Sequence, residues 1–136
     1  MADLGVTAAN VIQGANAKTE TALAGETITA GQVVYQDPTV RKYLKADSDS
    51  VSETVRRARG IALNNASLNQ PLVIQRSGQV TIGAALTPGL AYYLSKTPGG
   101  IAPVADIAAG GYSLIVGMAL SATVLDIDLK YSGVAV

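Results

Sequence analysis

The stretch Thr123-Val-Leu-Asp-Ile-Asp-Leu-Lys130 decides the fold class of this chain. In it, aliphatic side chains alternate with charged ones: Leu125, Ile127 and Leu129 against Asp126, Asp128 and Lys130. Such alternation is typical of a β-strand with one buried and one solvated face, because successive side chains of a strand point to opposite sides. Gln79-Val-Thr-Ile-Gly83 alternates in the same way. We therefore predict a mainly β protein.

Short aliphatic runs separated by Gly, Pro and Asn continue this pattern on both sides. Asp37-Pro38-Thr39 is a turn signal between two runs that predict a hairpin. A further run, residues 71–76, ends at Ser77-Gly78, before the alternating stretch 79–83. A short helix or ordered loop is predicted at residues 50–55, where Ser50 and Glu53 have the spacing of a capping box. Strands of this length with frequent turns predict a compact antiparallel β-sandwich or small β-barrel, with a β-tulip-like form left open. The remaining runs lie at residues 60–63, 90–95 and 112–117.

The N-terminal residues differ from the rest because they are rich in Ala, Thr, Asn and Gly and carry few large side chains. A segment of this kind can bury little by itself. It predicts either a frayed terminus or an arm that becomes ordered against a neighbour, for example by adding a strand to an exposed sheet edge. The predicted organisation is an extended N-terminal arm, residues 1–25, followed by a single β domain, residues 26–136.

The composition excludes several classes of function. The 136 residues include 10 basic and 10 acidic side chains, a balance that disfavours nucleic-acid binding. Cys and His are absent, which removes the usual ligands of zinc and haem as well as a Ser–His triad. The chain has no signal-like start and no apolar run of the ~20 residues that span a bilayer, so we expect no membrane partner and synthesis in the cytoplasm. Phe and Trp are also absent, and the resulting thin aliphatic core favours a homo-oligomer.

Acidic residues offer two candidate sites, each with a simpler explanation. Asp126 and Asp128 share one strand face and could act as a carboxylate pair, but alternation with aliphatic residues marks them as a solvated face. Asp47-Ser48-Asp49 could offer oxygens to Ca²⁺, but Glu53 comes too early for an EF-hand loop, so a solvated loop is the better interpretation.

Basic, aromatic and glycine-rich residues give three further candidates. Arg56-Arg-Ala-Arg59 could contact phosphates or an acidic partner surface, and in a neutral chain a local interface or salt bridge is the preferred role. Tyr92 and Tyr93 fit a core or interface better than a stacking platform. Thr97-Pro-Gly-Gly100 lacks the lysine of a phosphate-binding loop and predicts a turn. We predict no enzyme, with no catalytic, cofactor-binding or metal-binding residues.

Two sets of stretches resemble structural proteins of bacteriophages. Leu86-Thr-Pro-Gly-Leu-Ala-Tyr-Tyr-Leu-Ser95, Thr97-Pro-Gly-Gly-Ile-Ala-Pro103 and Gly117-Met-Ala-Leu-Ser-Ala-Thr123 are similar to a strand–turn unit of phage head-decoration and head-fibre proteins. Leu23-Ala-Gly-Glu-Thr-Ile-Thr-Ala-Gly-Gln-Val-Val-Tyr35 resembles, in outline, capsid cement proteins, including the lambda-type decoration proteins. Tyr43-Leu-Lys-Ala-Asp47, Gly60-Ile-Ala-Leu63 and Val73-Ile-Gln-Arg-Ser-Gly-Gln-Val80 extend this second likeness. Together they cover roughly residues 23–129.

The resemblance implies a compact β domain, often trimeric, that binds the outer surface of the capsid and stabilises the shell. Its implied partners are the major capsid protein and further copies of itself in a homotrimer, with no nucleic acid and no membrane. Its implied location is the virion, after synthesis in the host cytoplasm. Two alternatives stay open: the base of a head or tail fibre, and a glycan-binding β module. For the latter, stacking surfaces could come from Tyr43, Tyr92, Tyr93 and Tyr112, although the absence of Trp argues against it.

Overall fold

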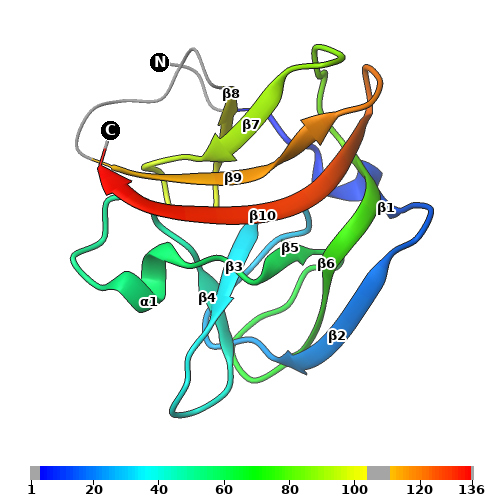
Figure 1. The fold of residues 1–136 in the computed structure, drawn as a ribbon. Coiled ribbons are helices and arrows are strands. Elements are labelled where there is room, and N and C mark those ends of the chain that lie inside the picture. The colour runs from blue at the N-terminus through cyan, green and yellow to red at the C-terminus, as the bar shows by residue number, and fades with distance from the viewer. Residues whose placement is uncertain (1–3, 104–110, 136) are drawn as a thin grey trace.

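The computed structural model describes residues 4–103 and 111–135, in which a 10-stranded antiparallel sheet curls into a half-barrel (Figure 1). The prediction of a mainly β, sandwich- or barrel-like fold is confirmed. The elements are η1 (Ala8–Asn10), β1 (Val11–Gln13), β2 (Lys18–Leu23), β3 (Val33–Gln36), β4 (Tyr43–Lys45), α1 (Glu53–Arg56), β5 (Gly60–Ala62), β6 (Pro71–Ile82), β7 (Ala91–Leu94), β8 (Ile101–Pro103), β9 (Tyr112–Ala119) and β10 (Val124–Ala135).

Strand β6 belongs to both halves of the sheet. Its first half pairs with β2 and β5, in a lower half ordered β2-β6-β5-β3-β4. Its second half pairs with β1 and β10, in an upper half ordered β1-β6-β10-β9-β7-β8 (Figure 1). The prediction that a strand ends at Ser77-Gly78 is therefore wrong, because β6 runs through this point. Gly78 has a φ of +91°, a backbone conformation that glycine adopts without steric cost, and so it marks the place where the strand passes from one half to the other.

The core consists of two aliphatic clusters. The larger fills the space enclosed by the upper half and one face of β3 and β5, and includes Val33, Ile61, Val80, Leu114 and Leu125. The smaller lies inside the lower half, which is drawn together by a bridge between Ala24 and Tyr43. Its members are Ala24, Ile28, Val34, Tyr43, Ala62, Ala66, Leu72 and Ile74.

Residues 4–25 are part of this domain, which corrects the prediction of an extended arm over residues 1–25. Leu4 N–H donates a 2.8 Å hydrogen bond to Ile101 C=O, and both β1 and β2 pair with β6. The small residues of this segment allow close approach of the backbone: a Cβ on Gly14 would lie 2.6 Å from the carbonyl oxygen of Gln79. The segment thus joins the domain through main-chain pairing, which a scarcity of large side chains does not prevent.

Other sequence predictions have mixed outcomes. The hairpin is confirmed as β3–β4, and the alternation in β10 places Leu125 and Ile127 in the core with Asp128 exposed. The helix is a single turn that begins after Ser52, and no side chain caps it. The predicted capping box is not formed, because the Ser50 hydroxyl accepts the N–H of Ser52 instead. Within the described residues, no helix is both long and apolar enough to span a membrane.

Candidate binding site: a cationic groove

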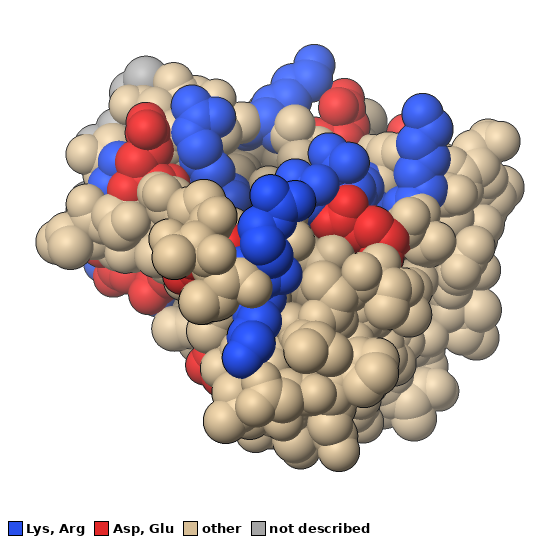
Figure 2. Space-filling view, turned by 90° about the horizontal axis from the view of Figure 1, so that it is seen from below, with Lys and Arg blue, Asp and Glu red and all other residues tan. Residues whose placement is uncertain are grey.

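A groove of about 800 Å³ lies where the two halves of the sheet diverge. Figure 2 shows this region of the molecule, with Lys and Arg side chains gathered at its centre and fewer carboxylates between them. We call this hollow the cationic groove, because five of its lining side chains carry a positive charge and one, Asp128, carries a negative charge. The lining residues are Lys18, Gln36, Pro38, Arg41, Arg57, Ala58, Arg59, Arg76, Ser77, Ile127, Asp128 and Leu129.

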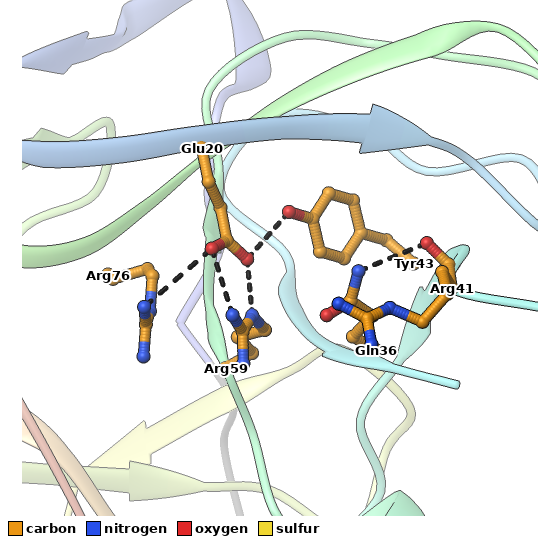
Figure 3. Close-up of polar contacts among 6 residues, drawn as sticks. All are labelled: Glu20, Gln36, Arg41, Tyr43, Arg59 and Arg76. Atoms are coloured by element: carbon orange, nitrogen blue, oxygen red, sulfur yellow. Dashed lines mark hydrogen bonds and ion pairs between the residues drawn. The ribbon is translucent and has the colours of Figure 1, made fainter. Parts of the chain in front are cut away.

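Glu20 on β2 anchors two of these cations (Figure 3). Its carboxylate accepts hydrogen bonds from both Nε and Nη2 of Arg59, the latter at 3.0 Å, and Arg76 Nη1 lies 3.7 Å from it. Tyr43 Oη donates a third hydrogen bond at 2.7 Å. The bonds from Arg59 hold the pKa of Glu20 below its usual value, although partial burial acts in the opposite direction. Burial, together with Glu20, raises the pKa of Tyr43.

Local backbone features place these arginines. Lys18 and Thr19 are adjacent on β2, but their partners on β6, Ser77 and Gln75, have Arg76 between them. Arg76 therefore has no partner on β2 and is the extra residue of a β-bulge. A bulge redirects its side chain, here toward Glu20. Arg59 precedes β5, and its N–H donates to Val34 C=O at 2.7 Å, which fixes its position beside β3.

Lys18 and Arg41 are the cations of the groove that form no ion pair with a carboxylate of the described residues. Arg41 lies in the β3–β4 turn with a φ of +64°, and its carbonyl oxygen accepts a 3.1 Å hydrogen bond from Gln36 Nε2. The Asp37 carboxylate accepts the N–H of Thr39 at 2.7 Å and stabilises the same turn. These two cations are therefore available to a ligand.

The run Arg56-Arg57-Ala58-Arg59 divides its side chains among three environments. Arg56 lies over the ring of Tyr112, 3.7 Å from its centroid, and donates to Tyr131 Oη at 3.0 Å. Arg57 lies 4.7 Å from the centroid of Tyr131 and pairs with Glu53 at 4.0 Å, at the rim of the groove. The predicted salt-bridge role is confirmed for Arg57 and Arg59. Arg56 instead ties the α1 turn to β9 and β10.

One edge of β10 borders the groove. Pairing between β10 and β6 ends at Ile127 and Gly78, and no described strand pairs with this edge at residues 128–135. Asp128 and Leu129, which follow Ile127 directly, line the groove. The groove is thus bounded by unpaired main-chain groups as well as by cations.

The acidic candidates lie on the outer face of β10 and in the loop that follows β4. Asp126 lies opposite Met118 on the outer face, and Asp128 pairs with Lys130 at 3.7 Å, in agreement with a solvated face. Asp47 accepts the N–H of Asp49 at 3.3 Å, and burial together with the neighbouring Asp49 raises the pKa of Asp47 to about 6. Across residues 4–103 and 111–135, no cluster of three or more acidic side chains could hold a metal ion.

The tyrosine and turn candidates have structural roles. Tyr43 and Tyr92 are 1% and 2% exposed, and the Tyr92 hydroxyl accepts the N–H of Thr87 at 2.9 Å. The predicted turn at Thr97-Pro-Gly-Gly100 connects β7 to β8, with Gly99 at a φ of +75°.

Sequence reasoning found one part of the groove, the arginines at 57 and 59. The other cations come from β2, the β3–β4 turn and β6, and each lies far from the Arg56–Arg59 run in the sequence. Comparison with known proteins adds no family: no family model matches the chain, and no curated protein matches it.

Proposed function

We propose that this chain is a structural protein of a bacteriophage particle, a decoration (cement) protein that binds the outer surface of the head and stabilises the shell. The observation that carries the proposal is the resemblance of residues 86–123 to the strand–turn unit of phage decoration and head-fibre proteins. In the structure this stretch supplies β7, β8 and β9 as neighbouring strands.

The geometry gives a physical reason for the glycines of that unit. Gly89 and Gly99 have φ values of +82° and +75° in the two turns that flank β7. Gly117 lies against β10, where an added Cβ would be 2.2 Å from the carbonyl oxygen of Asp126. These glycines therefore occupy positions whose geometry favours glycine, and this structural role for the glycines of the unit is what supports the proposal.

The proposed protein is a homotrimer, and one face of the upper half supports self-association. The pairing register places Ile12, Thr81 and Val124 side by side, and Met118 and Leu120 on the same face. Ile12 is 60% exposed, and Met118 and Leu120 are each 50% exposed. Light scattering after size exclusion should give three times the mass of one chain. The double variant I12K/L120E should then be a monomer, whereas V51K, at a fully exposed loop position, should remain a trimer.

The test of the capsid role is the copy number in purified virions, measured by quantitative mass spectrometry relative to the major capsid protein. A decoration protein should give a ratio near one to one or a simple fraction of it. A few copies per particle would contradict shell decoration and indicate a unique vertex or the tail, which is the fibre-base alternative. The glycan-binding alternative has little support, because Tyr43 and Tyr92 lie in the core.

A further inference from the structure

We propose that the cationic groove binds an extended, carboxylate-rich peptide segment of the capsid protein. The segment lies along the unpaired edge of β10, with its carboxylates directed at Lys18, Arg41 and Arg57. This inference rests on the proposed capsid function for the identity of the partner, while the chemistry of the ligand follows from the groove itself.

The charge of the groove is the first argument. The whole chain is neutral, yet five of its ten basic side chains line this one hollow. Asp128 and the underlying Glu20 compensate part of that charge, and Glu20 is shared by Arg59 and Arg76. A guanidinium has five N–H donors, so both arginines keep donors for a second carboxylate. The net excess of positive charge therefore selects an anionic ligand.

The free edge of β10 is the second argument, and it selects a peptide among anions. An unpaired strand edge presents N–H and C=O groups in alternation, which matches another extended main chain. The apolar lining contributed by Ile127, Leu129 and Ala58 suits the intervening side chains of such a strand. The volume of about 800 Å³ lies within the range of about 300–1,000 Å³ usual for ligand sites.

Phosphate-rich polymers fit these observations less well. Nucleic acid is bound by extended surfaces with a large excess of basic residues, and this chain has no net charge. The carboxylate of Asp128 also lies at the groove wall, where it would repel a uniformly charged backbone. An acidic peptide can place an apolar or polar residue opposite Asp128, because its charges are spaced by its sequence.

The experiment uses the intact protein and a synthetic seven-residue peptide that alternates Val and Glu. Its controls are the Val–Gln analogue and a heparin oligosaccharide of the same charge. Binding is followed by calorimetry, and the site by the shifts of amide NMR signals. The Val–Glu peptide should shift the amide signals of residues 128–130 and bind at least about tenfold more tightly than the other two probes. Its affinity should fall between about 50 and 200 mM salt, because the attraction is electrostatic.

Two double variants, which change the net charge of the protein by the same amount, test where the peptide binds. K18E/R41D reverses the two cations that pair with no carboxylate of the described residues, and Asp tolerates the positive φ at position 41. K42E/K96E makes the same change in net charge outside the groove. The groove variant should lose at least about tenfold in peptide affinity, and the control variant should stay within about twofold of the parent. Equal losses in both variants, tighter binding of heparin, or peptide shifts away from β10 would each overturn the proposal.

Binding of the same proteins to capsid shells separates this inference from the proposed function. If the parent coats shells and K18E/R41D coats them at least about tenfold more weakly, the groove is the capsid contact. If both coat shells equally, the groove inference is wrong while the capsid function stands. If the parent binds the peptide but no shells, the capsid protein is the wrong partner and the proposed function fails.

Discussion

Among single residues, Glu20 has the largest predicted effect on the groove, because it connects β2 to Arg59, Arg76 and Tyr43. Replacing it by Gln leaves two guanidinium groups close together without their shared carboxylate. We expect E20Q to lower the free energy of unfolding by about 1–3 kcal/mol, the range for losing a charged partner in a partly buried hydrogen-bond network. Urea denaturation at pH 7 measures this change.

The control for E20Q is E53Q, since Glu53 pairs with Arg57 at 4.0 Å in an exposed i,i+4 arrangement. A pair of this kind contributes about 0.3–0.5 kcal/mol. A loss in E20Q no larger than that in E53Q would show that the network around Glu20 does not stabilise the fold. The pH dependence adds a second check. The folded-state pKa of Glu20 is lowered, so its contribution is present above the usual carboxyl pKa and is lost as pH falls through the folded-state value.

Asp47 predicts a pH dependence of the opposite sign. Burial first, and then the neighbouring Asp49, raise its pKa from 3.8 to about 6. Folding therefore opposes the ionisation of Asp47, and the ionised side chain lowers the free energy of unfolding. This loss of stability is complete above pH 6, decreases as pH falls through 6, and is absent below pH 3.8. D47N should accordingly be more stable than the parent at pH 7.5, and the difference should disappear near pH 4. Denaturation midpoints of both proteins at these two pH values test this.

D49N provides the matched comparison, because it removes the neighbour and keeps Asp47. In D49N, the pH range over which the ionisation of Asp47 changes the free energy of unfolding should move to lower pH. The reason is that the interaction with Asp49 is one of the causes of the raised pKa of Asp47. A D47N protein with the same advantage at both pH values would contradict the assignment of this pH dependence to Asp47.

Among the elements, β6 has a bend on which both halves of the sheet depend. Gly78 has a φ of +91°, and a Cβ there would lie 2.3 Å from Asn16 O, so G78A suffers both backbone strain and a collision with main-chain atoms. Gly89 has a similar φ of +82°, but a Cβ added to it would meet nothing within 4 Å. We expect G89A to cost about 1–2 kcal/mol, from the left-handed conformation alone. G78A should cost at least about 2 kcal/mol more, as expected for overpacking.

Chemical denaturation of the two glycine variants measures this difference directly. If G78A and G89A lose similar amounts of unfolding free energy, the backbone of the segment before β2 can move away from β6 at little energetic cost. A G78A protein that unfolds in two steps would instead indicate that the halves of the sheet separate when the bend is strained.

The elements also show what the sequence could predict. The strands β7 and β10 and the β3–β4 hairpin are local features, each specified by alternation or by turn residues next to it, and they were predicted. Ser77-Gly78 has the residues of a turn, but Gly78 serves as a bend within one strand, a choice that depends on partners far along the chain. β1 and β2 pair with β6 through main-chain hydrogen bonds. Because nearly every residue type has these main-chain groups, the amino-acid composition does not reveal the pairing.

For the whole molecule, the cationic groove was the part least accessible to prediction. Its positive charges come from four segments, and only the sheet topology brings Lys18 and Arg76 into one groove with Arg59 and Arg41. Overall neutrality disfavoured nucleic-acid binding and gave no indication of this groove, because net charge averages over the surface. Lys18 and Arg41, which pair with no carboxylate of residues 4–103 and 111–135, became recognisable only once their neighbours in space were known.

The composition of residues 1–25 predicts an arm, whereas the structure makes residues 4–25 part of the domain. Deleting residues 1–24 would remove β1 and β2, and with them Glu20 and the core contacts of Val6 and Val11. It would also expose one edge of β6 along most of its length. Small domains have only about 5–15 kcal/mol of stability, so we expect this truncation to abolish cooperative unfolding and dispersed amide NMR signals. Deleting residues 1–3, which keeps Leu4 and its hydrogen bond, should leave both unchanged. A truncated protein that stays folded and fails only to bind shells would support the prediction of a separate arm. If the truncated protein is unfolded, the capsid contact must instead be made by the surface of the intact domain.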